Sequence, residues 1–165
     1  MAYTPAENVL LGQAIDENST TQKVDLGTVV RCKDPTYGAG EFIYLLGVAS
    51  TAVGSLVTYN VSTWATTLAA VGTNLPRPIA IAMAATVASE YGWYQISGVA
   101  VAKKTATVSL AANAAVGVLT IGLAAGTGSG KEIQGALVAA VASAKSDVTT
   151  VQLITNRPHM QGRVT

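Results

Sequence analysis

The chain has 165 residues, of which 50% are hydrophobic and only 12% charged, with ten Lys and Arg against nine Asp and Glu. This length fits one domain with a sizeable core, and a net charge of +1 leaves no basic surface for nucleic acid or an anionic membrane. The single cysteine, Cys32, excludes an intramolecular disulfide, and no apolar run reaches the roughly 18 residues that a membrane span needs.

The low charge has two explanations that composition does not separate. An average soluble domain carries about a quarter charged residues, twice the proportion found here. Either much of the surface is covered in an assembly, or this is a stable β domain whose surface is rich in Ser, Thr and Ala.

Residues 1–25 differ from the rest of the chain. The stretch AIDENSTTQK is polar, and Val9, Leu10 and Leu11 form the only apolar anchor. We expect an extended N-terminal arm that is ordered only where it touches a neighbour; a partly disordered leader is the alternative. Either way the segment lies outside the core, so deleting residues 2–20 is expected to leave the fold nearly unchanged. The first residues lack the basic start and apolar centre of a signal peptide.

Residues 26–47 predict a strand, a turn and a second strand. Val29 and Val30 precede a charged corner. Pro35, Gly38 and Gly40 then supply the fixed and positive φ values that a reversal needs. The run EFIYLL that follows is rich in β-forming residues.

From there to residue 157 the chain is a series of short apolar runs separated by turn residues. A spacing of about 8–12 residues is typical of a β-sandwich or barrel. The Ala-rich stretch 136–145 favours either one short helix or a strand. The sequence therefore predicts an all-β fold: a compact β-sandwich or barrel over residues 26–157, an N-terminal arm, at most one short helix, and a C-terminal tail over residues 158–165. The further runs expected as strands are 56–59, 63–68, 79–83, 92–96, 99–102, 108–110, 118–123, 133–141 and 149–155.

Several of these runs are apolar on both faces, which indicates burial by a core on one side and by a partner or loop on the other. Residues 42–46 and 93–96 are the leading candidates for self-association. In YGWYQI, Trp93 and Tyr94 point to opposite faces, so a flat platform for stacking a sugar or base is disfavoured against a core or interface strand. The expected interface side chains are Val9, Leu10, Leu11, Phe42, Tyr44, Trp93 and Tyr94.

No motif selects a catalytic site. The sequence AGTGSGKE at 125–132 imitates a phosphate-binding loop, but Ala125 replaces its first glycine and Glu132 its metal-binding hydroxyl. We expect a flexible hairpin loop there. His159 is the only histidine and is expected in a solvated tail. The carboxylates are scattered, and nothing selects a pair for acid–base chemistry. We expect a non-enzyme with no cofactor and no metal.

One segment resembles a known family. Residues 26–51 read LGTVVRCKDPTYGAGEFIYLLGVAST, and the small decoration (cement) proteins that stabilise the heads of tailed bacteriophages carry a similar LGT–hydrophobic–R-x-KDPTYG-x-GEFIYL-x-GVAST pattern. The resemblance continues through VTYN, PIAIAMA, YGWYQI and NRP, and so covers roughly residues 26–158.

The resemblance implies a structural protein of the virion, made in the bacterial cytoplasm and located on the capsid exterior. Its partners would be the major capsid protein and further copies of itself, as a homodimer or homotrimer, with no direct contact with nucleic acid or membrane. Two other classes remain open: a β-rich receptor- or carbohydrate-binding module of a phage or cell-surface fibre, and a hydrolase whose site the sequence does not reveal.

Overall fold

A computed structural model describes residues 4–5, 12–142 and 147–162 of the chain. Within these residues every regular element is a β-strand, which confirms the all-β prediction. The proposed helix is absent from the described part of 136–145, because residues 136–138 belong to a strand. The strands are β1 (Thr4–Pro5), β2 (Asn18–Ser19), β3 (Val29–Asp34), β4 (Gly38–Leu46), β5 (Leu56–Tyr59), β6 (Thr66–Leu68), β7 (Ile79–Ala82), β8 (Tyr91–Lys103), β9 (Ala115–Thr120), β10 (Leu123–Gly126), β11 (Glu132–Val138) and β12 (Thr150–Met160).

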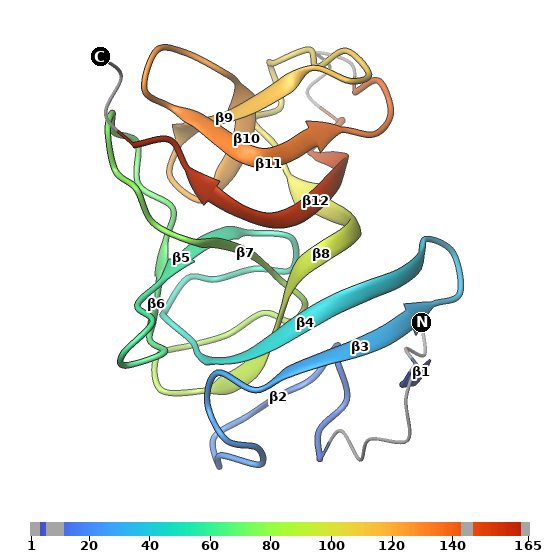
Figure 1. Cartoon of the computed structure of the whole chain (residues 1–165), viewed down its shortest axis with the longest axis vertical. Coiled ribbons are helices and arrows are strands. Elements are labelled where there is room, and N and C mark those ends of the chain that lie inside the picture. Colours follow the sequence, from blue (N-terminus) through green and yellow to red (C-terminus); the bar gives the residue numbers. More distant parts are fainter. Residues whose placement is uncertain (1–3, 6–11, 143–146, 163–165) are drawn as a thin grey trace.

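The strands form one antiparallel sheet that curls into a half-barrel, consistent with the expected sandwich or barrel. Its main path runs β1-β3-β4-β8-β12-β11-β9-β10, and β2 and the β5–β6–β7 group attach to its side. Figure 1 shows β9, β11 and β12 at one end of the molecule, β3 and β4 at the other, and β8 passing between them. Both ends of the molecule therefore depend on β8.

Strand β8 changes partners at its middle. Residues 91–97 pair with β4, and residues 97–103 pair with β12. Gly98 stands at this change with a φ of 98°. A Cβ there would lie 2.6 Å from the carbonyl oxygen of Ala39, so the close approach of the β3–β4 hairpin requires glycine.

The β9–β12 end encloses its own core. On β8, Ala100 and Ala102 face inward and Val99 and Val101 outward. The smaller side chains lie inside because the sheet is tightly curled there. A parallel bridge between Lys104 and Ala124 ties the edge strand β10 back to the end of β8.

The β3–β4 end is built in two layers around β4. Ile43 and Leu45 pack with Val57 and Tyr94 on one face. Phe42 and Tyr44 pack on the other face, together with Trp93. This alternation follows from the two-residue period of a strand, and it means that β4 is covered on both sides by its own chain.

Residues 12–25 cover the second of these two faces of β4. This corrects the prediction that residues 1–25 are an arm outside the core. Ile15 is buried beside Trp93 and Tyr44, and β2 pairs with the start of β8. The side chains of Gln13 and Asn18 form hydrogen bonds to residues 44 and 85–91 of the domain, so polarity did not prevent packing. Deleting residues 2–20 is therefore expected to expose the aromatic side chains of this layer and destabilise the domain.

The predicted C-terminal tail also needs correction. Strand β12 continues to Met160, which pairs with Ile133 and is buried. Pro158 is accommodated because residues 156–158 of β12 face the single residue Gly135 of β11, which makes a bulge in β12 of the kind where proline is tolerated. His159 is an exposed residue of this strand and not part of a tail.

Candidate functional site

The aromatic residues expected at an interface lie in the core. Phe42, Tyr44, Trp93 and Tyr94 are each at most 1% exposed. The prediction that they form a surface for a partner is wrong, because residues 12–25 and strands β5 and β7 cover both faces of the sheet at this point. Val9, Leu10 and Leu11 lie outside the described residues.

Hydrogen bonds fix this aromatic layer. The Tyr44 hydroxyl donates to Oε1 of Gln13 at 2.6 Å, and Nε1 of Trp93 donates to the Gln13 carbonyl at 3.0 Å. The Tyr44 and Trp93 rings meet edge to face, with centroids 4.9 Å apart. Burial raises the pKa of Tyr44, and the backbone N–H of Lys23 partly offsets this by donating to the hydroxyl. The layer is thus a structural feature.

One surface on which apolar side chains stand side by side is the outward side of β8, β12 and β11. We call Val99, Val101, Leu137 and Ile154 the outer face. Ile154 lies directly opposite Val99 on one side and Leu137 on the other, so three side chains form a row across the sheet. Val101, Leu137 and Ile154 are 39%, 44% and 46% exposed.

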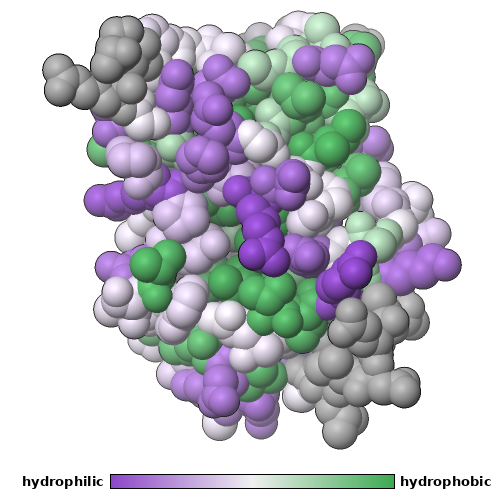
Figure 2. Space-filling model, in the orientation of Figure 1, coloured by the Kyte–Doolittle hydropathy of each residue, from purple (hydrophilic) through white to green (hydrophobic). Residues whose placement is uncertain are grey.

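The outer face continues toward the loop after β11. A hollow of about 200 Å³ is lined by Val101, Val141 and Val148, with Tyr37 at its side. The amide of Gln152 donates to the Tyr37 hydroxyl at 3.4 Å, which links the β3–β4 hairpin to this face. Figure 2 shows apolar side chains gathered over the end of the molecule where β11 and β12 lie. Clustering of apolar residues of this kind marks interaction surfaces.

The sequence contains the apolar residues of this face, but its strand pattern alone does not tell which of them point outward. In residues 99–102 valine alternates with alanine, and in residues 153–154 two large aliphatic side chains are adjacent. An alternation of large and small apolar residues allows either to face inward. Only the tight curl of the sheet decides that alanine is inside.

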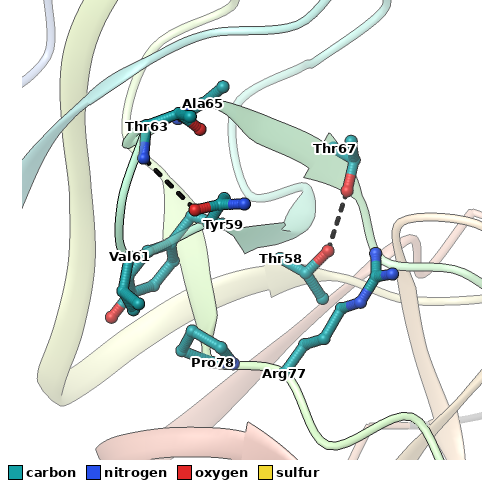
Figure 3. A pocket seen from close by; sticks show the side chains of 9 residues that line it. Thr58, Tyr59, Val61, Thr63, Ala65, Thr67, Arg77 and Pro78 are labelled. Atoms are coloured by element: carbon teal, nitrogen blue, oxygen red, sulfur yellow. Dashed lines mark hydrogen bonds between the residues drawn. The ribbon is translucent and has the colours of Figure 1, made fainter.

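A second candidate site is a hollow of about 490 Å³ beside the β5–β6 hairpin. Figure 3 shows that its wall consists of threonine hydroxyls, the ring of Tyr59 and the side chain of Arg77. Thr58 and Thr67 face each other across β5 and β6, and their hydroxyls are 2.9 Å apart. The lining residues are Thr58, Tyr59, Asn60, Val61, Thr63, Ala65, Thr67, Arg77 and Pro78.

The electrostatics of this hollow are cationic. None of its lining residues is acidic, and Arg77 is exposed. Arg157 is near enough to lower the pKa of Tyr59, against a larger rise caused by burial. Arg157 itself pairs with Glu41 at 3.1 Å. Of these two arginines, Arg77 is therefore the one that forms no ion pair with a described carboxylate.

The phosphate-loop-like segment has a different setting from the one predicted. Strands β10 and β11 each pair with β9 and not with one another, so residues 127–131 form a crossover and not a hairpin loop. The crossover passes over Gly117, where a Cβ would lie 2.8 Å from the Lys131 carbonyl oxygen. A strand follows the loop where a phosphate-binding loop requires a helix.

The described residues contain no group of three or more His, Cys, Asp and Glu side chains placed to hold a metal ion. They also contain no helix long and apolar enough to cross a membrane.

Comparison with known protein families, with curated proteins and with solved structures found no match to this chain.

Proposed function

We propose that this protein is a structural component of a phage head, which binds the outer surface of the capsid as a symmetric homo-oligomer and stabilises the contacts between capsomers. The outer face is the observation that supports self-association and binding to a capsid. A row of aliphatic side chains stands open on a hydrogen-bonded sheet, in a chain with few charges. Burying this row against a second copy or a capsid protein would remove apolar area from water.

The capsid part of the proposal is supported by the resemblance of residues 26–51. In the fold these residues form β3, the β3–β4 turn, β4 and the loop that follows. Tyr37 of the turn contacts Gln152, beside the outer face. The segment with the distinctive sequence therefore reaches the surface that we propose for assembly.

The mechanism would be mass action. A ligand that binds only the assembled lattice stabilises that lattice by RT ln(1 + c/Kd) per site, where c is its free concentration. An oligomer that engages several capsomers at once gains avidity without any single strong contact. Because the outer face is aliphatic, these contacts would depend little on salt.

Self-association is tested by a charge placed in the row. We expect the wild-type protein to sediment as an oligomer at about 100 µM, and Ile154→Lys to sediment as a monomer because a buried lysine would have no partner. Val87→Lys is the matched control, since Val87 is 59% exposed and lies in the loop before β8. A wild-type monomer, or an Ile154→Lys oligomer identical to wild type, would contradict the role of the outer face.

Capsid binding is tested with undecorated heads of the phage that carries the gene. We expect the wild-type protein to pellet with the heads, to saturate, and to raise the temperature at which the heads break. Binding should be similar in about 50 mM and about 500 mM NaCl, because apolar contacts are not screened. Ile154→Lys should bind more weakly than Val87→Lys. Absence of the wild-type protein from the pellet would refute the proposed function.

A further inference from the structure

We propose that the hollow between β5, β6 and residues 77–78 is a binding site for an acidic saccharide, meaning a sugar ring that carries a carboxylate. This site is separate from the outer face and does not depend on the proposed capsid function. The hollow, at about 490 Å³, falls within the range of small-molecule sites, about 300–1,000 Å³. Its residues combine one cation, several hydroxyls and an aromatic ring.

The hairpin loop that forms one wall is held in a single conformation. Trp64 has a φ of 57°, a conformation that costs about 1–3 kcal/mol in a residue other than glycine. Its backbone N–H donates to the Asn60 carbonyl at 2.7 Å and its carbonyl accepts from the N–H of Leu46 at 3.0 Å. Its indole lies against Gly27, where a Cβ would be 2.5 Å from the ring. Strain that the surroundings maintain in this way is typical of preorganised sites.

The opposite wall is equally fixed. Arg77 stands between Pro76 and Pro78, which restrict the backbone on both sides of it. Its carbonyl accepts from the N–H of Met160 at 2.8 Å, which anchors this turn to β12. In Figure 3 the guanidinium extends along the hollow toward Thr67. A carboxylate entering the hollow would meet a fork of N–H donors whose backbone is already in position.

The neutral groups suit a polyhydroxylated ligand. The Thr58 and Thr67 hydroxyls bond to each other, which still leaves one O–H and several lone pairs for a ligand. Asn60 uses its side-chain oxygen on the N–H groups of Ser62 and Thr63, at 2.7 and 3.2 Å. Its NH₂ group donates to no described residue and is available to a sugar hydroxyl.

The aromatic side chain gives the site an apolar wall. The Tyr59 ring lies between Val61 and Pro78 in Figure 3, with the Trp64 ring stacked near it at a centroid distance of 6.4 Å. A sugar ring has an apolar C–H face that packs on such a wall. An inorganic anion would use Arg77 alone and would leave the hydroxyls and the ring without a role.

The test uses sodium D-glucuronate, with D-glucose and sodium acetate as the neutral and ring-free probes, followed by amide chemical shifts of the full-length protein. We expect glucuronate to shift signals of residues 58–67 and 77–78 with a Kd in the millimolar range, about −4 kcal/mol. Glucose and acetate should each bind at least about tenfold more weakly, which is about 1.4 kcal/mol. Arg77→Gln should weaken glucuronate at least about tenfold, since it removes the charge-assisted pair.

Arg31→Gln is the matched control, because Arg31 is an exposed arginine on β3 and lines none of the hollow. It should leave glucuronate binding unchanged. Three outcomes would overturn the proposal: no shift at about 50 mM glucuronate, equal binding of acetate and glucuronate, or equal losses in the two arginine variants. A glutamate-rich peptide that binds through Arg77 where glucuronate does not would assign the hollow to a protein partner instead.

Discussion

Replacing Gln13 by alanine measures how far residues 12–25 hold the domain together. Gln13 is 9% exposed, and its side chain makes three hydrogen bonds. Its amide donates to the carbonyls of Glu17 at 2.7 Å and Tyr91 at 3.0 Å, and its oxygen accepts from the Tyr44 hydroxyl at 2.6 Å. The alanine variant loses all three.

The magnitude follows from these bonds. A typical intramolecular hydrogen bond contributes about 0.5–1.5 kcal/mol, and a buried donor left without an acceptor costs about 1–3 kcal/mol. The Tyr44 hydroxyl would be such a donor, because its side chain is fully buried. We therefore expect Gln13→Ala to lower the free energy of unfolding by about 2–4 kcal/mol, which corresponds to a fall of about 5–15 °C in Tm for a domain of this size.

The assay is urea unfolding followed by tryptophan fluorescence, with Gln22→Ala as the control. Gln22 lies in the same segment and is exposed, so its replacement should change the free energy by less than about 0.5 kcal/mol. If Gln13→Ala is as stable as Gln22→Ala, the segment does not stabilise the fold and should be interpreted as a separate arm.

Two further perturbations test the core. The ammonium of Lys104, 2% exposed, donates to the carbonyls of Thr105, Ala106 and Val108 at 2.9–3.1 Å, so Lys104→Met should cost about 2–4 kcal/mol in urea unfolding, whereas Lys103→Met should be nearly neutral. An equal effect of the two would contradict the role of the buried ammonium. Burial also raises the pKa of Tyr94 above the ordinary tyrosine value of 10.0. The folded state then retains its proton while the unfolded chain ionises, so stability should fall as the pH rises above about 10. Tyr94→Phe should reduce this loss of stability. An unchanged pH dependence in the variant would contradict the role of Tyr94.

The fold class followed from the sequence because turn residues and β-forming runs alternate along the whole chain. The hairpin of β3 and β4 lies where residues 26–47 predict it. The two ends of the domain were harder to place. Polar residues such as Gln13 are uninformative about burial when their partners are distant backbone groups. Proline ends a strand unless it lies in a bulge, and the sequence around Pro158 does not reveal the bulge of β12 in which it lies.

The candidate sites were less accessible to sequence reasoning than the fold. Aromatic residues such as Trp93 attract attention as interface candidates, yet their size makes them the side chains that gain most from the core. The outer face depends on which of two apolar faces the sheet turns inward. The β5–β6 hollow joins residues 58–67 to Arg77, and their proximity follows from the pairing of β5 with β7, which no local pattern specifies.

Strand β8 makes the two ends of this molecule one mechanical unit. The aromatic layer is built on residues 91–97 of this strand and the aliphatic barrel end on residues 97–103, so one continuous backbone joins the two ends. Because displacing β8 at one end pulls on the same backbone that is hydrogen-bonded at the other end, we expect the domain to unfold in a single cooperative transition. A protein built in this way has few partly open forms in which unpaired strand edges are offered to proteases or to aggregation.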